Sequence, residues 1–168
     1  SGAGLIRNPE LAKEIIRETK RGAGNLPVSV KTRIGYNKIV TEEWISHLIE
    51  AKPDAIIIHG RTMKEMSKVP AHWDEIGKAA VLCRRADIPI IGNGDIASYA
   101  EGVTKAKQYN LDGIMVGRGV FSNPWFLTYF HKSKVIMSNF FCVNWSVFTN
   151  SSKPRLSIKK SHCEITSS

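Results

Sequence analysis

Two glycine-rich turns, each directly after an apolar run, are the segments of this sequence best suited to hold a ligand. The run at residues 88–91 leads into Gly92-Asn93-Gly94-Asp95, and the run at residues 111–116 leads into Gly117-Arg118-Gly119. Glycine has no Cβ, so backbone N–H groups at such turns can approach an anion closely. Two consecutive turns of this kind predict that both grip one phosphate group.

Charged side chains mark the ends of two other apolar segments. Lys31 and Arg33 share one side of an expected strand at residues 28–34, whose other side is apolar. In a barrel that side would face the mouth, where a cation can meet an electron-rich ring or a phosphate; the alternative is an edge strand with a solvated face. His59 ends the next apolar run, and Arg61 follows it. The alternatives to a role in a site are a hydrogen-bonded core residue for His59 and a solvated surface charge for Arg61.

The elements that must position these side chains alternate regularly along the chain. Expected strands begin near Val28, Ala55, Ile88 and Leu111, and each is followed by a helical pattern. This order predicts an α/β fold of about four parallel strand–helix units, with functional residues at the C-terminal ends of the strands. Helices are expected to start where capping or acidic residues precede apolar periodicity, at Asn8, Thr41, Asp74 and Ser98.

The composition narrows the class of protein. With 42% apolar and 23% charged residues the chain is typical of a globular protein, and no apolar run approaches the length of a membrane span. Its three cysteines have no paired or metal-like spacing, which favours a reducing cytoplasm and predicts no metal site. The net charge of +9 suits a polyanionic partner such as RNA without being specific for it.

The last quarter of the chain has a different character. Residues 131–168 hold 6 Lys+Arg against 1 Asp+Glu, compared with 18 against 14 in residues 1–130. They show no capped helix and no clean alternation. We therefore expect a domain of residues 1–130 and an irregular basic tail of residues 131–168, disordered from about Thr149 onward.

Several motifs, taken together and in order, resemble those of the tRNA-dihydrouridine synthases. No single motif would be specific for this family, but the order and the spacing of the whole set are. The resemblance covers about residues 1–130. The motifs are Val30-Lys-Thr-Arg-Ile-Gly35, Ile58-His-Gly-Arg-Thr62, Ile91-Gly-Asn-Gly-Asp-Ile96, and Met115-Val-Gly-Arg-Gly119 with Asn123-Pro-Trp125.

This resemblance implies the C-terminal half of an FMN-binding (β/α)₈ TIM barrel. In that family NADPH reduces FMN, and the flavin then reduces uridine in tRNA to 5,6-dihydrouridine. The resemblance places Arg33 and Arg61 near the substrate uridine or the RNA backbone. It implies that the following residues bind the cofactor: Lys31 and His59 beside the flavin, and Asn93, Gly94, Asp95, Gly117 and Arg118 around its phosphate and ribityl chain.

The sequence also departs from the family pattern. The cysteine that acts as the acid is expected in a loop before Ser1, because residues 1–4 resemble the glycine-rich segment after that loop. Cys83 cannot replace it, since its helical spacing with Ile76 and Ala79 places it in the core. We thus expect no catalytic residue in this chain, weak or no activity alone, and a dimer or partner chain that completes the barrel. The alternatives are another phosphate-binding TIM-barrel enzyme and a non-catalytic RNA-binding fragment.

Overall fold

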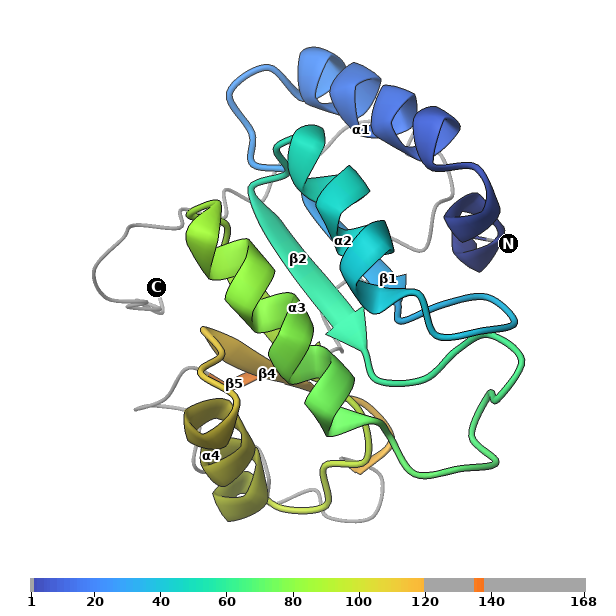
Figure 1. The fold of residues 1–168 in the computed structure, drawn as a ribbon. Helices are drawn as coiled ribbons and strands as arrows, with labels where there is room; N and C mark the ends of the chain where they lie inside the picture. Colours follow the sequence, from blue (N-terminus) through green and yellow to red (C-terminus); the bar gives the residue numbers. More distant parts are fainter. Residues whose placement is uncertain (1, 120–134, 138–168) are drawn as a thin grey trace.

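A parallel five-stranded sheet with helices along one face makes up the part of the chain that the computed structural model describes, residues 2–119 and 135–137 (Figure 1). The strands lie in the order β1-β2-β3-β4-β5, and every neighbouring pair is parallel. The strands are β1 Ser29–Arg33, β2 Ala55–His59, β3 Ile90–Asn93, β4 Gly113–Val116 and β5 Val135–Met137. The helices are the 3₁₀ helix η1 Gly2–Arg7 and the α-helices α1 Pro9–Ala23, α2 Thr41–Glu50, α3 Trp73–Arg85 and α4 Tyr99–Gln108.

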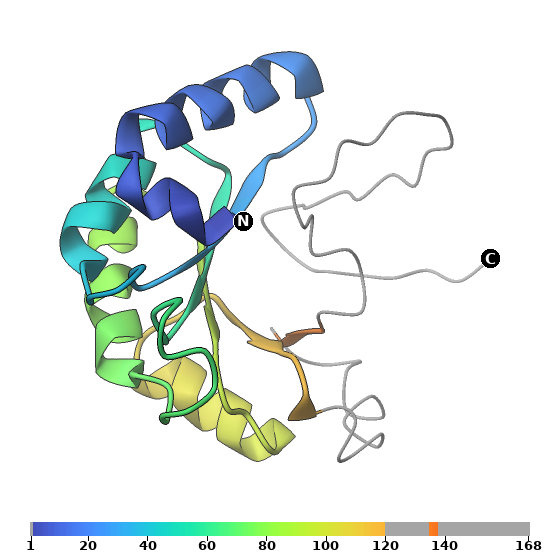
Figure 2. The same cartoon turned by 90° about the vertical axis from the view of Figure 1, so that its right-hand side faces the viewer.

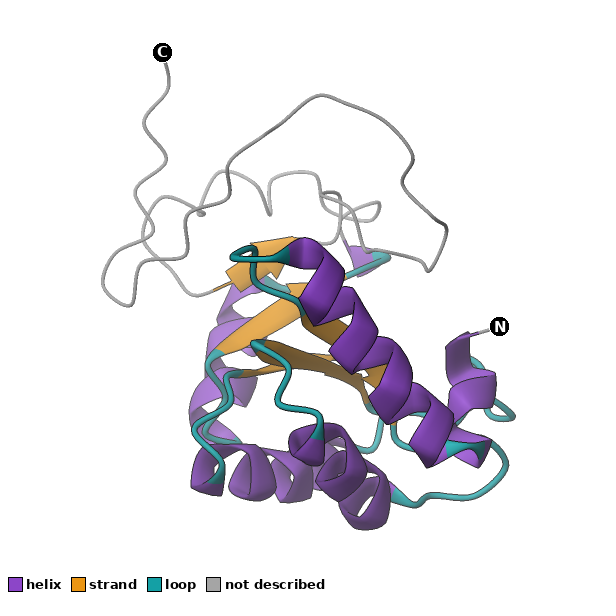
Figure 3. Cartoon of the chain, turned by 90° about the horizontal axis from the view of Figure 1, so that it is seen from above, coloured by secondary structure: helices purple, strands orange, loops and turns teal. Residues whose placement is uncertain are grey.

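The helices cover only one face of this sheet. Figure 2 shows them on one side of the strands, and Figure 3 shows them in an arc around the outside of a curved sheet. This arrangement confirms the expected α/β partial barrel. No described helix is long and apolar enough to cross a membrane.

Alternate residues of the strands supply two separate apolar clusters. Ile56 and Ile58 of β2 belong to the large cluster that includes the buried residues of the helices, such as Ile76. Ile57 belongs to a small second cluster with Ile91 and Met115. Because successive side chains of a strand point to opposite faces, the small cluster lies on the face without helices. That inner face also carries the polar residues at the strand ends.

Local sequence determines where several helices begin. Asn8 caps α1 by accepting a hydrogen bond from the backbone N–H of Leu11 at 3.2 Å, and Ser98 caps α4 in the same way through Glu101 N–H at 3.1 Å. These two starts confirm the sequence prediction. The predicted helix after Thr41 is also present as α2, but the capping role predicted for Thr41 was wrong: Thr41 is the first residue inside the helix, with its side chain buried, and Val40 takes the N-cap position.

The fifth strand was not predicted. Val135–Met137 pairs in parallel with β4 and lies inside the segment that we expected to be an irregular tail. Three apolar residues without alternation, and without a capped helix before them, carry too weak a pattern to indicate a strand. Where the domain ends stays a prediction. The expected disorder after Thr149 lies outside the described residues.

The buried thiol of Cys83 gives a test of this packing. Cys83 lies on the sheet-facing side of α3 with 0% exposure, and its burial raises the pKa of the thiol to about 12. Since the thiolate is the reactive form, iodoacetamide at pH 8 should leave Cys83 unmodified in the folded protein and label it in urea. Peptide mass spectrometry measures this, and labelling of Cys83 without denaturant would contradict the packing.

Candidate active site

The register of the parallel strands places the polar strand ends side by side. Arg33 pairs with His59, His59 with Asn93, and Asn93 with Met115. Residues paired across parallel strands point to the same face, so these four side chains form one row on the inner face. Lys31 lies two residues earlier on β1 and therefore points to the same face, one row lower.

All nine residues predicted to bind cofactor or substrate border one cleft at this end of the sheet. The cleft has a volume of about 700 Å³, within the range of small-molecule sites. The predicted residues around it are Lys31, Arg33, His59, Arg61, Asn93, Gly94, Asp95, Gly117 and Arg118, and further lining residues include Met66, Ser67, Met115 and Gly119. The structure thus brings the predicted set together, while the role of each residue stays a prediction.

The two glycine turns converge on this cleft. The side-chain amide of Asn93 in the first turn donates a hydrogen bond at 2.7 Å to the backbone carbonyl of Met115, in β4 two residues before the second turn. Gly119 of the second turn packs so tightly on the first that a Cβ there would overlap the carbonyl oxygen of Ile96. Gly94 has a φ of +146°, a conformation that side chains with a Cβ rarely adopt. Glycine is therefore required at both turns for them to meet.

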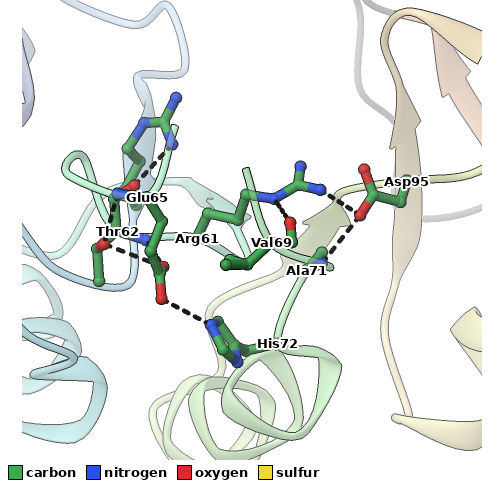
Figure 4. Close-up of polar contacts among 8 residues, drawn as sticks. Arg61, Thr62, Glu65, Val69, Ala71, His72 and Asp95 are labelled. Carbon is green, nitrogen blue, oxygen red and sulfur yellow. Dashed lines mark hydrogen bonds and ion pairs between the residues drawn. The ribbon is translucent and has the colours of Figure 1, made fainter. Parts of the chain in front are cut away.

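An ion pair joins the buried Arg61 to the more exposed Asp95 of the first glycine turn (Figure 4). Arg61 is only 3% exposed; its Nε donates to the carbonyl oxygen of Val69 at 2.5 Å, and Nη2 pairs with the Asp95 carboxylate. That carboxylate also accepts the backbone N–H of Ala71 at 2.9 Å. Partial burial would raise the pKa of Asp95, but the hydrogen bonds from Arg61 and Ala71 lower it overall. The predicted contact of Arg61 with substrate stays a prediction.

The rim loop, residues 62–70 between β2 and α3, has a second anchor at its base. Glu65 accepts hydrogen bonds from the backbone N–H of Thr62 at 2.7 Å and from its hydroxyl at 3.0 Å. Its other carboxylate oxygen lies 2.9 Å from Nε2 of His72 (Figure 4). The sequence analysis missed these residues. The spacing Thr62-x-x-Glu65, which resembles a capping box, is the signal that could have indicated an ordered turn.

Cationic groups dominate the electrostatics of the cleft. Burial first, and then the charges of Arg33, Lys31 and Arg61, lower the pKa of His59 from 6.5 to about 4, so its ring is neutral at pH 7. Arg33 is half-buried and donates to the carbonyl oxygen of Thr62 at 3.1 Å. Burial, and then the charge of Arg61, lower the pKa of Arg33. With Asp95 neutralised by its ion pair, the lining favours an anionic ligand.

The fold and the cleft define a class: a parallel α/β partial barrel that presents two converging glycine turns and several cations to an anionic ligand. Within that class the chain belongs to the dihydrouridine synthase family, since residues 1–157 match the family model "Dihydrouridine synthase (Dus)". This match extends beyond residue 130, where the motif resemblance ended.

Individual relatives agree with the family match. The chain is 47% identical over 128 residues to a probable tRNA-dihydrouridine synthase of Staphylococcus aureus (strain N315), an alignment that covers 73% of this chain and 38% of that protein. It is 48% identical over 128 residues to a probable tRNA-dihydrouridine synthase of Staphylococcus epidermidis, with the same coverage. A third relative, probable tRNA-dihydrouridine synthase 2 of Bacillus subtilis, is 45% identical over 126 residues. The chain thus spans 38% of the length of these relatives.

The lowered pKa of His59 predicts a pH-dependent stability. Between pH 6.5 and about 4 the unfolded chain binds a proton at His59 that the folded chain does not, so stability should fall as the pH drops through this window. At pH 5 the loss should be about 1 kcal/mol, after allowing for solvent screening of a half-buried ring. Urea unfolding of the wild type and of His59→Gln at pH 7 and pH 5 isolates this effect. An equal loss in both proteins would show that His59 does not cause it.

Proposed function

We propose that this chain binds FMN and contributes to the NADPH-dependent reduction of uridine to 5,6-dihydrouridine in tRNA. The observation that carries the proposal is the convergence of two glycine turns on one cationic cleft, in a member of the dihydrouridine synthase family. The family match decides against an unrelated phosphate-binding TIM-barrel enzyme. The hypothesis of RNA binding by the basic tail concerns residues outside those described, apart from β5.

The residues of the cleft fit the phosphate end of FMN. Gly94 and Gly117 line the cleft in their turns, and the guanidinium of Arg118 supplies a positive charge beside them. The N-terminus of α4 contributes less than its position suggests. Its capping groups already use the local donors: Ser98 accepts the N–H of Glu101, and the Glu101 carboxylate accepts the N–H of Ala97 at 2.9 Å. Phosphate binding would therefore depend on the turns and Arg118 more than on the helix dipole.

Lys31 and His59, in neighbouring rows of the inner face, fit the flavin ring. Lys31 would place its charge beside the ring, where it attracts negative charge, and the neutral imidazole of His59 can donate one hydrogen bond and accept another. When bound, FMN supplies hydride transfer, and the protein orients the ring and its substrate. Arg33, at the mouth of the cleft, would contact the uridine or the RNA backbone.

The names of the relatives support tRNA as the substrate. A uridine must leave its base stack to reach a ring held in this cleft, which requires a mouth open to RNA. Cys83 cannot donate the proton to the uridine carbon, because it is fully buried among the residues that pack between helix and sheet. We therefore assign no catalytic acid among the described residues; Cys142 and Cys163 lie outside them. A cytoplasmic location follows from the same proposal and from the lack of paired cysteine spacing.

Gly117 allows a test of FMN binding that leaves the fold intact. Among the described residues, no atom lies within 4 Å of a Cβ placed at Gly117, and its φ is not in the left-handed region, so Gly117→Val should fold normally. The added side chain would occupy space that the phosphate needs. FMN affinity, measured by the quenching of flavin fluorescence, should fall roughly tenfold or more, since 1.4 kcal/mol of lost contact is enough for that change.

Gly22→Val is the matched control for this experiment. A Cβ at Gly22 would likewise meet none of the described residues. Gly22 lies near the end of α1 and does not line the cleft, so its variant should bind FMN like the wild type. Failure of the wild-type chain to bind FMN, or equal binding by Gly117→Val, would contradict the proposed cofactor site.

A further inference from the structure

We propose that Arg61 is a positioning residue that fixes the first glycine turn against the rim loop, and that it does not contact the substrate. The proposal rests on the proposed function only where it concerns FMN, because the turn that Arg61 fixes is predicted to bind the FMN phosphate. The structural part stands on the contacts of Arg61 itself.

The first step is that the guanidinium of Arg61 already joins two separate segments. It bonds Val69 of the rim loop and Asp95 of the glycine turn, which lies 34 residues further along the chain than Arg61. The side chain is 4% exposed, so its charge is shielded from an RNA strand in the cleft. A planar guanidinium with fixed donor directions is suited to such a double contact, whereas a lysine ammonium at the same place could make only one of the two well.

The second step concerns the backbone of the turn. Asp95 has a φ of +45° and follows Gly94 at +146°, so two successive residues lie outside the usual region. A non-glycine residue in that conformation costs on the order of 1 kcal/mol and persists where its surroundings hold it. Here the Asp95 carboxylate is held by Arg61 and by the N–H of Ala71. The ion pair therefore maintains the backbone conformation of the turn that lines the cleft.

The third step is that the rim loop is a rigid support for this contact. Besides the Glu65 anchor, the backbone N–H groups of Met63 and Lys64 donate to the carbonyl oxygens of Gly35 and Tyr36, each at 3.0 Å. These bonds attach the rim loop to the segment after β1. Arg61 thus connects the ends of β1, β2 and β3, and it sets the position of the first glycine turn relative to the row that carries His59.

Removing the guanidinium should release the turn without unfolding the protein. Asp95 retains 38% side-chain exposure, so water can solvate its carboxylate once Arg61 is gone. We therefore expect the loss of order at Ala71 and in the turn, and not in the sheet. This distinguishes a positioning role from a general contribution to stability.

Amide hydrogen exchange measured by NMR tests the role without any flavin. In Arg61→Met the amide of Ala71 should exchange on the order of tenfold faster, while amides within β2 and β3 keep their wild-type rates. Arg61→Lys should fall between the two. Arg85→Met, which removes an exposed arginine at the end of α3, is the matched control and should change neither set. Unchanged exchange at Ala71 in Arg61→Met would overturn the proposal.

Titrations with FMN and with an unmodified tRNA transcript give the second test. Arg61→Met should weaken FMN binding on the order of tenfold, the usual size when a group that orients a binding residue is lost. Asp95→Asn combined with Arg61→Met should bind FMN no more weakly than Asp95→Asn alone, since the two residues act as one unit.

An Arg61→Met protein with normal FMN affinity and weakened tRNA affinity would show that Arg61 contacts substrate, and so refute the proposal. If the wild type binds no FMN, the proposed function fails, and exchange at Ala71 alone decides the role of Arg61.

Discussion

Parallel pairing of neighbouring strands is the constraint on which the whole site depends. Each strand ends at the same edge of the sheet, and the register of one pair determines which residue of the next strand stands beside it. A shift by one residue on β2 would turn His59 toward the helices and bring Ile58 to the cleft. The apolar packing between β2 and α3 prevents this shift, because it needs Ile56 and Ile58 on the helical face. The packing of the core therefore determines which residues of β2 face the cleft.

Desolvation determines how the charges of the cleft act. Several cations share a half-buried space with one carboxylate, and that carboxylate is committed to Arg61. Burial first, and then the remaining positive charge, makes protonation of His59 unfavourable and leaves its ring neutral, while the same positive charge favours an anion such as a phosphate. One electrostatic arrangement therefore accounts for both the neutral histidine and the preference of the cleft for an anionic ligand.

The rim loop shows how a segment without regular secondary structure can be ordered. Its anchors are local, as between Thr62 and Glu65, and long-range, as between Arg61 and Asp95. Met66 lies between them, exposed and at the border of the cleft, with a φ of +52°. The loop is thus part of the site, although neither periodicity nor composition distinguishes it from an ordinary connection.

Sequence by itself determined the order of elements through β4, the two glycine turns and the residues around the cleft. These follow from local rules: alternation places Lys31 and Arg33 on one side of a strand, and only glycine suits the approach at Gly94 and Gly119. Tertiary structure alone decided that Arg61 is buried against Asp95, that Thr41 lies inside α2, and that Val135–Met137 joins the sheet. Each of these depends on partners distant in sequence, or on a burial that no local pattern encodes. Ion-pair geometry and strand pairing are set by where the backbone runs, so they become visible only when the chain is folded.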